Sequence, residues 1–414
     1  GCGTDEVCVL KFNVNDSAGN VNDTETISIT VDNTNPSVSS LTVNDTVLRT
    51  DAYIKIDVDV VDVNRNDSDV YVGNSSTVAM VLISGNTFEI NTTPAAMGCP
   101  VDSSCVLTVH ATDYAGNVNN TESIIITTDN TNPSVSNVAV NDSILKSTDS
   151  LRINATVTDT NSIVSVVVSN GSSVSMSVLS GNVYYADTSP NVLGCPGNGT
   201  CVLVVRAEDE AGNVNNSESI SIIVDDIAPL ISYNSDTTPE GNLSQDYIFV
   251  NVSFSDASPS SGLKNLTYYL WNSTGLVDSV SYSSGLNSPN WTNFTGLSDG
   301  EYWFNVSVYD WAGNRNNSAT RNVVLDTVNP AVSNPTTNAT YLKPTDYFEI
   351  NVTVVDENID TVLVGNNSYV EMNSVGSNVY RVVTTPNNLG CGTDEVCVLK
   401  FNVNDSAGNV NDTE

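Results

Sequence analysis

The sequence contains few basic residues and no long hydrophobic run. It has 13 lysines and arginines against 48 aspartates and glutamates, which gives a formal net charge of −35 at pH 7. Because phosphate contacts require clustered lysine and arginine, this balance excludes nucleic acid as an expected partner. No apolar run is long enough to span a bilayer, so no membrane span is predicted in these residues. The acidity favours divalent cations and keeps a long chain soluble by self-repulsion, and adaptation to high salt is a second interpretation.

Residues suited to catalysis are equally scarce. The single histidine, His110, lies in the segment Val106–Ala111, where it is interpreted as a strand residue rather than as a general base. The cysteines fall into pairs, and no combination of serine, histidine and aspartate recurs along the chain. We therefore do not expect an enzyme.

The first 25 residues of the chain are identical to the last 25. Gly1–Glu25 and Gly390–Glu414 agree at every position, which sets a period of 389 residues. Within this period, a linker that ends in proline recurs about every hundred residues, at Pro36, Pro133, Pro229 and Pro330. Repeats of this length indicate one small domain each. The sequence has neither an initiating methionine nor a signal peptide, and we expect a window from one continuous tandem repeat. A subunit completed by a neighbouring chain is the alternative.

Hydrophobic alternation within one unit predicts short β-strands. Leu151–Val157 alternates apolar and polar residues, as expected for a strand with one buried face. Val174–Val178 and Val183–Ala186 flank Ser180 and Gly181, which indicates a hairpin. With turn signals about every 8–12 residues and no helical period, the unit is predicted to be a seven-stranded antiparallel β-sandwich. The predicted domains are a partial one at 1–31, three complete ones at 32–128, 129–224 and 225–325, and one truncated before its last strand at 326–414.

Four cysteine pairs share the spacing C-x5-C and the same place in their units. The pairs are Cys2 and Cys8, Cys99 and Cys105, Cys195 and Cys201, and Cys391 and Cys397. Because no second pair of ligands lies nearby in sequence, zinc is not favoured. A short disulfide in each pair is the better interpretation, and it implies an oxidising, extracellular location. The unit at 225–325 has no such pair.

A second motif, D-x-A-G-N, occurs near the end of every unit, at Asp16–Asn20, Asp113–Asn117, Asp209–Asn213, Asp310–Asn314 and Asp405–Asn409. It resembles the tandem bacterial and archaeal Ig-like domains of large cell-surface proteins. The resemblance implies tandem seven-stranded Ig-like β-sandwiches in an extended rod, with the motif as the turn between strands F and G. Leu297–Tyr302 resembles the tyrosine corner of this fold, and the C-x5-C pair takes its place in the other units.

Acidic residues recur in register at three places in each unit. They lie in the linker, after strand B and at the start of D-x-A-G-N, which in an Ig-like sandwich share one end. The residues are Asp32, Asp62 and Asp113; Asp129, Asp159 and Asp209; Asp225, Asp256 and Asp310; and Asp326, Asp356 and Asp405. Calcium binds six to eight oxygens of this kind, and magnesium suits such a site less well. Two interpretations stay open, namely calcium at the interdomain junctions and ordinary turn chemistry of aspartate.

One N-x-[ST] sequon recurs six residues after the D-x-A-G-N aspartate. We expect N-linked glycans at this shared position, which comprises Asn22, Asn119, Asn215, Asn316 and Asn411.

Together these features predict an extracellular, glycosylated structural protein of archaeal source. It would be the repeat unit of a surface filament, a stalk or a surface-layer thread, with further copies of itself as partner. The alternative is the rod of a cell-surface adhesin whose binding tip lies outside these residues.

Overall fold

The computed structural model describes residues 1–412, and all regular structure in them is β-strand. These residues contain no helix, so none of them crosses a membrane as one. The chain divides into two compact units, of which the first comprises Gly1–Ser143, Thr148–Cys195 and Cys201–Ile222. The second comprises Ile144–Ser147, Pro196–Thr200 and Ile223–Glu414. The predicted all-β fold is confirmed. The last two residues of the predicted domain 326–414 lie outside the described residues.

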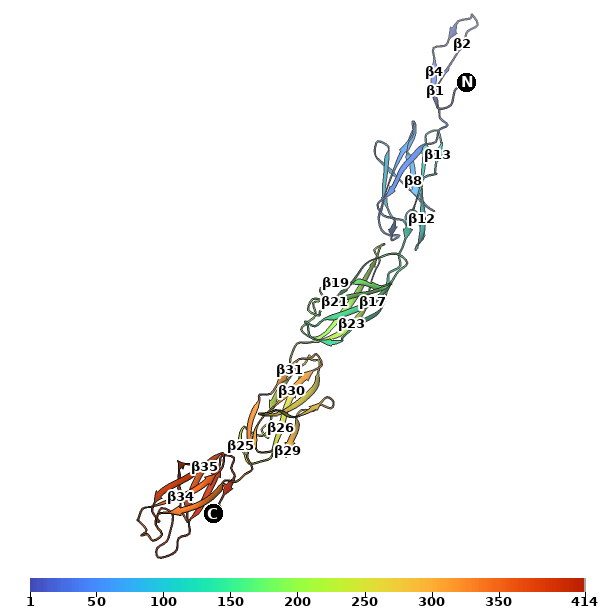
Figure 1. The fold of residues 1–414 in the computed structure, drawn as a ribbon. Coiled ribbons are helices and arrows are strands. Elements are labelled where there is room, and N and C mark those ends of the chain that lie inside the picture. The colour runs from blue at the N-terminus through green and yellow to red at the C-terminus, as the bar shows by residue number, and fades with distance from the viewer. Residues whose placement is uncertain (413–414) are drawn as a thin grey trace. The chain divides into compact units, whose positions relative to one another are not determined.

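The N-terminal residues form a hairpin, labelled β1, β2 and β4 in Figure 1. In it β1 (Glu6–Lys11) pairs antiparallel with β4 (Thr26–Val31), and β2 (Val14–Asn15) pairs with β3 (Val21–Asn22). No hydrophobic side chain of residues 1–35 is buried, and Ile27 remains 51% exposed. The hairpin is therefore held by backbone hydrogen bonds without a core of its own.

The first complete sandwich packs two sheets around one core (Figure 1). One sheet has the strand order β10-β11-β7-β5, and the other has the order β6-β14-β12-β8-β9, with β13 paired to β12. The strands are β5 (Ser37–Val43), β6 (Val47–Leu48), β7 (Ile54–Val61), β8 (Arg65–Gly73), β9 (Thr77–Ala79), β10 (Val81–Ser84), β11 (Thr87–Thr92), β12 (Ser103–Asp113), β13 (Val118–Asn119) and β14 (Ser123–Thr128).

Alternation along the strands explains this core. In β7, Ile54, Ile56, Val58 and Val60 are each at most 1% exposed, while the residues between them face outward. Phe88 of β11 is fully buried among them. Burial of one such side chain contributes roughly 1.5–3 kcal/mol, so the period of two in the sequence fixes which face of the strand packs inward.

The seven predicted strands A to G correspond to β5, β7, β8, β10, β11, β12 and β14. Their arrangement, A-B-E-D in one sheet and G-F-C in the other, is that of an Ig-like sandwich. The structure adds three short strands, β6, β9 and β13. Of these, β6 joins the edge beside β14 in parallel.

The second sandwich repeats this arrangement in sheets of order β15-β17-β21-β20 and β16-β23-β22-β18-β19. Its strands are β15 (Ser134–Val140), β16 (Ile144–Leu145), β17 (Leu151–Thr158), β18 (Ile163–Ser169), β19 (Ser173–Ser175), β20 (Ser177–Ser180), β21 (Val183–Thr188), β22 (Asn198–Asp209) and β23 (Val214–Asp225).

The predicted single strand at Val174–Val178 is wrong in one respect, because the chain changes sheet within it. β19 pairs with β18, whereas β20 pairs with β21 in the facing sheet. Met176 lies at the crossing, where its side chain is 7% exposed and its backbone N–H donates to Val166 O. Residues 173–177 alternate between exposed and at least partly buried positions, as a continuous strand would, because Met176 is buried where the chain crosses between the sheets. The sequence pattern alone therefore does not reveal that there are two strands.

The third sandwich has sheets of order β24-β26-β29 and β25-β32-β30-β27-β28, with β31 paired to β30. Its strands are β24 (Leu230–Tyr233), β25 (Gly241–Leu243), β26 (Tyr247–Ser255), β27 (Leu263–Asn272), β28 (Gly275–Tyr282), β29 (Asn290–Thr295), β30 (Gly300–Asp310), β31 (Arg315–Asn317) and β32 (Arg321–Leu325).

The fourth sandwich has sheets of order β33-β34-β38-β37 and β36-β35-β39-β40. Its strands are β33 (Ala331–Thr337), β34 (Phe348–Val355), β35 (Ile359–Gly365), β36 (Tyr369–Glu371), β37 (Asn373–Gly376), β38 (Val379–Thr384), β39 (Lys400–Asp405) and β40 (Val410–Asn411).

Two kinds of staple fix the start of strand F. All four predicted disulfides are present, with Cα–Cα distances of 5.4–5.5 Å. In the third sandwich, the Tyr302 hydroxyl donates to Ser298 O at 3.0 Å, which confirms the tyrosine corner. Cys105 pairs across the sheet with Ile126, and Tyr302 pairs with Val323. Cys105 and Tyr302 each precede the D-x-A-G-N aspartate of their unit by the same number of residues. The disulfide therefore replaces the tyrosine at one and the same register position.

Candidate metal centre

Three aspartates meet at one end of each of the four sandwiches. In every group one carboxylate oxygen of each residue lies within 4.8 Å of the other two. The groups are Asp32, Asp62 and Asp113; Asp129, Asp159 and Asp209; Asp225, Asp256 and Asp310; and Asp326, Asp356 and Asp405. All twelve residues singled out in the sequence are thus brought together in the predicted sets.

The strand ends explain why these residues meet. The first aspartate of each group closes or follows β4, β14, β23 or β32 and so lies in the linker to the next sandwich. The second follows β7, β17, β26 or β34, and the third is the last residue of β12, β22, β30 or β39. Strands B and F end on the same side of the sandwich, and that is the side at which the linker arrives.

The D-x-A-G-N turn shapes the third aspartate of each group. In the second sandwich, Asp209 Oδ1 accepts from the backbone N–H of Asn213 at 2.8 Å, and its Oδ2 accepts from Asn213 Nδ2 at 2.9 Å. Gly212 has a φ of 84°, in the left-handed region that favours glycine. The same Asn213 Nδ2 also donates to the linker carbonyl of Asp129 at 3.1 Å. One asparagine therefore ties the turn to the linker.

The other two carboxylates of the second group are connected by Asn161. Its backbone N–H donates to Asp159 Oδ1 at 2.8 Å, and its Nδ2 donates to Asp129 Oδ2 at 2.6 Å. Asp129 and Asp209 are only 2% and 1% exposed. Buried carboxylates held in this way keep free lone pairs that converge on a common point.

The third group contains a buried oxygen without a hydrogen-bond partner. Asp225 Oδ2 accepts from the backbone N–H of Ser261 at 2.6 Å, and Asp256 Oδ2 accepts from that of Gly262 at 3.1 Å. Asp256 Oδ1 is buried and has no partner among the described residues. Burial, followed by the negative charges of Asp225 and Asp310, raises the pKa of Asp256. The arrangement therefore favours either a proton or a cation on Asp256.

The fourth group shows the same electrostatic conflict. Burial raises the pKa of Asp356, and the charges of Asp326 and Asp405 raise it further against a hydrogen bond from Asn358. By contrast, the pKa of Asp113 in the first group is lowered, because hydrogen bonds from Asn117 and neighbouring backbone N–H groups outweigh the effect of its burial. The pKa of the turn residue Asp113 is thus lowered, whereas the pKa values of Asp256 and Asp356, which follow strand B in their sandwiches, are raised.

These groups fit a hard divalent cation. The ion pairs described for residues 1–412 include none of the twelve aspartates, although the charge of Asp209 acts on Arg49 and raises the pKa of that guanidinium together with Asp51. Further buried and unpartnered oxygens adjoin the first two groups, namely Asn64 Oδ1 and Asn213 Oδ1. Two oxygens on opposite sides of a calcium ion at about 2.4 Å each are about 4.8 Å apart, so the observed spacing is compatible with one ion per group.

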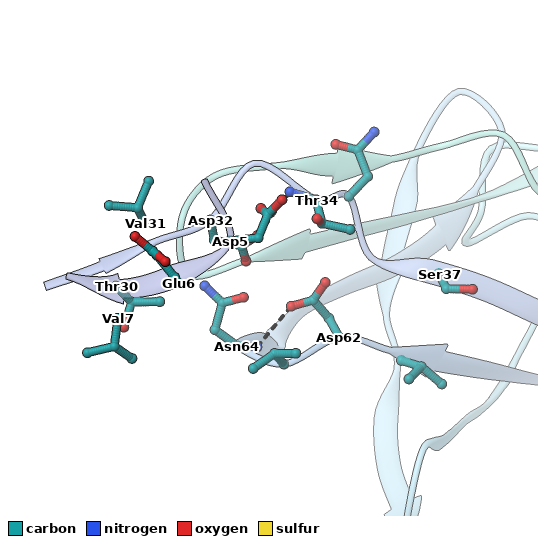
Figure 2. A pocket seen from close by; sticks show the side chains of 13 residues that line it. Asp5, Glu6, Val7, Thr30, Val31, Asp32, Thr34, Ser37, Asp62 and Asn64 are labelled. Carbon is teal, nitrogen blue, oxygen red and sulfur yellow. Dashed lines mark hydrogen bonds between the residues drawn. The ribbon is translucent and has the colours of Figure 1, made fainter. Parts of the chain in front are cut away.

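The first group lies beside a pocket formed by the hairpin and the first sandwich. Figure 2 shows Asp32 and Asp62 with Asn64, whose backbone N–H donates to Asp62 Oδ1 at 2.9 Å. Asp5 approaches from β1's side of the hairpin, and its Oδ1 accepts from the backbone N–H of Asn33 at 2.7 Å. Four of the residues that line this pocket, Asp5, Glu6, Asp32 and Asp62, carry carboxylates (Figure 2).

The N-terminal hairpin contains the D-x-A-G-N turn without the sandwich around it, and so shows what the turn alone produces. Asp16 makes the same turn as Asp209, with bonds of 2.9 Å from Asn20 N and 2.8 Å from Asn20 Nδ2. It is nevertheless exposed, and among residues 1–412 it belongs to no group of three converging acidic residues. Turn chemistry thus accounts for the conformation of the D-x-A-G-N aspartate. It does not account for the two further carboxylates that converge on it.

The recurring sequon has a structural contact that the sequence did not reveal. Asn119 Nδ2 donates to Pro36 O at 2.8 Å, and Asn215, Asn316 and Asn411 likewise donate to the carbonyl of their linker prolines at 2.8–2.9 Å. Asn119 Oδ1 accepts from the hydroxyl and N–H of Thr121. The recurrence of both the asparagine and the proline was visible, but only the fold places them in contact. Glycans at this position remain a prediction.

Two stretches of this chain match a bacterial Ig-like domain. The family's sequence model matches residues 3–33 and 240–327. Among curated proteins no match was found.

Several solved structures are similar to parts of the chain. One is a Ca2+-stabilized adhesin that helps an Antarctic bacterium bind ice, with 16% identity, coverage of 92% of this chain and 97% of that one, and a TM-score of 0.40. Another belongs to a 1.5-MDa bacterial ice-binding adhesin, with 14% identity, coverage of 71% and 99%, and a TM-score of 0.31. The fibronectin(III)-like modules of Clostridium thermocellum CbhA show 15% identity, coverage of 46% and 93%, and a TM-score of 0.27. With TM-scores below 0.5, these likenesses decide neither the fold nor the function of this chain.

Proposed function

We propose that this chain is a structural repeat of an extracellular surface protein, and that each of its linkers is tied to the following sandwich by a calcium ion. The observation that carries the proposal is the fourfold recurrence of three converging carboxylates where the linker meets the sandwich. Four disulfides support an oxidising, extracellular compartment. Tandem Ig-like sandwiches without a recurring catalytic set suit a spacer or a thread rather than an enzyme.

The three aspartates of each group would supply the carboxylate ligands. In the second group these are Asp129, Asp159 and Asp209, and the unpartnered Asn213 Oδ1 adds an oxygen beside them. Loop carbonyls and water would complete the six to eight oxygens that calcium takes. Magnesium requires a tighter octahedral arrangement and would bind more weakly.

A bound cation would fix the linker rather than fold the sandwich. The linker is already held by hydrogen bonds such as that from Asn213 Nδ2 to Asp129 O. The cores lie apart from these residues and consist of apolar side chains from both sheets. Removing the ion would therefore leave the strands intact and let the mutually repelling carboxylates push the linker away from the two loops.

Calcium binding can be tested by isothermal titration calorimetry of the full chain. We expect four ions per chain, and three after Asp356→Asn, which removes one ligand from the fourth group. The matched control is Asp360→Asn, because Asp360 lies four residues further along in β35 and is exposed. A chain that binds no calcium, or one whose stoichiometry is the same in both variants, would show that these aspartates serve only the turns.

The adhesin rod is the second candidate, favoured by the match of two segments to a bacterial Ig-like domain. Both functions use the same sandwiches, and they differ in what lies beyond these residues. Electron microscopy of native material labelled with antibody against the chain separates them. A uniformly labelled thread supports the structural role, and a labelled stalk that ends in an unlabelled head supports the adhesin.

A further inference from the structure

The third sandwich has an aromatic pair on one outer face where the other sandwiches have ion pairs. The position concerned lies in strand B, seven residues before the aspartate that follows this strand. In the other three sandwiches it is charged and pairs with a residue of strand E, as Lys55–Glu89, Arg152–Asp187 and Glu349–Arg381. In the third sandwich the same position is Phe249 of β26.

Phe249 contacts Trp291 of the neighbouring strand β29, with ring centroids 5.7 Å apart and an interplanar angle of 37°. Both rings point away from the core, because the adjacent residues Ile248 and Thr292 are at most 7% exposed. Trp291 is 59% exposed, and Tyr247 beside the pair is 41% exposed. Contact of these rings with water is unfavourable, so a group that covers this aromatic face would stabilise the sandwich.

A glycosylation sequon lies in the middle of the aromatic face. Asn293–Thr295 reads N-F-T, and Asn293 pairs directly with Phe249 across the two strands. Trp291 precedes Asn293 by two residues in β29 and therefore shares its face of the sheet. Directly opposite residues of an antiparallel pair have Cβ atoms about 5 Å apart, so a sugar on Asn293 would lie within reach of both rings.

The amide of Asn293 is open to modification. Asn293 is exposed, and its side chain makes no hydrogen bond within residues 1–412. Asn251, which belongs to a second sequon on the same face, differs in this respect. Its Nδ2 donates to the two carboxylate oxygens of Asp236 at 2.9 and 3.1 Å, and its Oδ1 accepts from Asn234 Nδ2 at 3.0 Å. A sugar on Asn251 would displace that carboxylate.

β29 is also an edge strand. Its sheet has the order β24-β26-β29, whereas strand E of the other sandwiches has β10, β20 or β37 on its far side. Within residues 1–412 no strand pairs with the outer edge of β29. An exposed edge with apolar side chains is prone to pair with another chain, and a bulky polar group on it prevents this.

We propose that Asn293 carries an N-linked glycan whose first sugar lies on the rings of Phe249 and Trp291. Attachment forms a bond between Asn293 Nδ2 and C1 of the sugar, breaks the bond from that carbon to the phosphate of an activated glycosyl phosphate donor, and releases one amide proton. The C–H groups on one face of a pyranose ring are apolar and pack on an aromatic ring, while its hydroxyls remain in water. The glycan would cover the aromatic face and block the edge of β29.

The inference rests on the extracellular role proposed above but not on the cations, because none of these residues belongs to an aspartate group. Glycopeptide mapping of the native chain tests the site. Fragmentation that keeps the sugar attached should place a glycan on Asn293 and none on Asn251, and it distinguishes both from the nearby sequon at Asn290. A bare Asn293, or a glycan on Asn251 in its place, would overturn the proposal. Neither result affects calcium binding, which calorimetry measures separately.

Urea unfolding followed by tryptophan fluorescence tests the contact between sugar and rings. Asn293→Gln, expressed in the chain's own host, should lower the folding equilibrium constant of the third sandwich about tenfold, as expected when about 50 Å² of aromatic surface loses its cover. In unglycosylated chain the same substitution should change this constant by less than about twofold, which controls for the side chain itself. An equal loss in both preparations would overturn the role of the glycan.

The matched control is the double variant Phe249→Lys, Trp291→Glu, which introduces the ion pair of Lys55 and Glu89 at the same two positions. Here Asn293→Gln should have no effect beyond about twofold, and a tenfold loss would show that the sugar does not act through the rings. Acrylamide quenching needs no variant. The native chain should be quenched less than unglycosylated chain, because the glycan covers Trp291, and equal quenching would also overturn the proposal.

Discussion

Replacing Asp256 by asparagine should have opposite effects on the third sandwich with and without calcium. Asp256, Asp225 and Asp310 place carboxylate oxygens within 4.8 Å of one another, and Asp225 and Asp310 are fully buried. At an effective dielectric constant of about 20, two charges at 4.8 Å repel by roughly 3 kcal/mol. Without a cation, Asp256 is the residue of the three that takes up a proton most readily, because its pKa is raised by burial and by these two neighbours.

The free energy of protonating Asp256 sets an upper limit on the effect of the substitution in EDTA. Protonating a carboxyl of ordinary pKa 3.8 at pH 7 costs about 4 kcal/mol, so the ionised cluster cannot cost more than that. Asp256 is partly exposed, and water screens part of the repulsion. We therefore expect Asp256→Asn to stabilise the third sandwich by about 2 kcal/mol at pH 7 in EDTA. In calcium at about 100 times its Kd, the wild-type site gains about 2.7 kcal/mol. We expect the variant, which has lost a carboxylate ligand, to gain less than about 0.7 kcal/mol, and the same substitution then becomes destabilising.

The pH dependence in EDTA has a defined sign. Since the folded-state pKa of Asp256 is raised, the folded chain binds more protons than the unfolded chain between pH 3.8 and the raised value. The stability of the wild-type site therefore falls as pH rises through that window. The advantage of Asp256→Asn should disappear below about pH 4 and reach its full size above the raised pKa.

The chain provides its own reporter for this experiment. Its four tryptophans, Trp271, Trp291, Trp303 and Trp311, all lie in the third sandwich. Fluorescence-detected urea unfolding therefore follows this sandwich alone, although the whole chain does not unfold in two states. The control Asp278→Asn changes an exposed residue of β28 and should alter stability by less than about 0.5 kcal/mol in either condition. An effect of Asp256→Asn with one sign in both EDTA and calcium would refute the reasoning.

Other outcomes follow from the staples, the sequon and the linkers. Tyr302→Phe leaves the carbonyl of Ser298 without its donor and should lower the tryptophan-detected stability by about 1–2 kcal/mol; an unchanged midpoint would contradict this role. Dithiothreitol should leave that same transition unchanged, because the third sandwich has no disulfide, while lowering the transitions of its neighbours seen by circular dichroism. Glycopeptide mapping should find Asn119 occupied, since an N-glycosylated amide keeps one N–H for Pro36 O; a bare Asn119 beside filled sequons elsewhere would be the contrary result. Small-angle scattering should show a shorter maximum dimension in EDTA than in calcium, and equal dimensions would argue against cation-fixed linkers.

The sequence predicted those features that local periodicity and repetition encode. Alternation in Leu151–Val157 identified β17 within one residue, and the repeated aspartates predicted three residues that meet in space. The prediction that the aspartates meet came from comparing the same positions in four units. A residue that recurs at one position in every unit is expected to make the same tertiary contact in each. No single unit would have distinguished Asp159 from an ordinary turn aspartate.

What the sequence did not predict depends on contacts between distant segments. The sheet change at Met176 preserves alternation and is invisible as a pattern. The bond from Asn119 to Pro36 O joins residues 83 positions apart, and a sequon offers a sufficient explanation without it. The raised pKa of Asp256 likewise comes from burial and from two carboxylates in other loops.

The terminal repeat separates local from tertiary causes within one molecule. Asp16 and Asp405 lie in identical sequences and make the same turn, with asparagine N–H to Oδ1 distances of 2.9 and 2.8 Å. The turn is therefore a local property. Asp405 is nonetheless 3% exposed beside Asp326 and Asp356, whereas Asp16 is exposed and belongs to no such group within residues 1–412. Only the sandwich around the turn creates the electrostatic conflict that a cation would relieve. An isolated peptide of residues 13–23 should consequently favour the turn and yet show no calcium affinity beyond that of a single carboxylate loop.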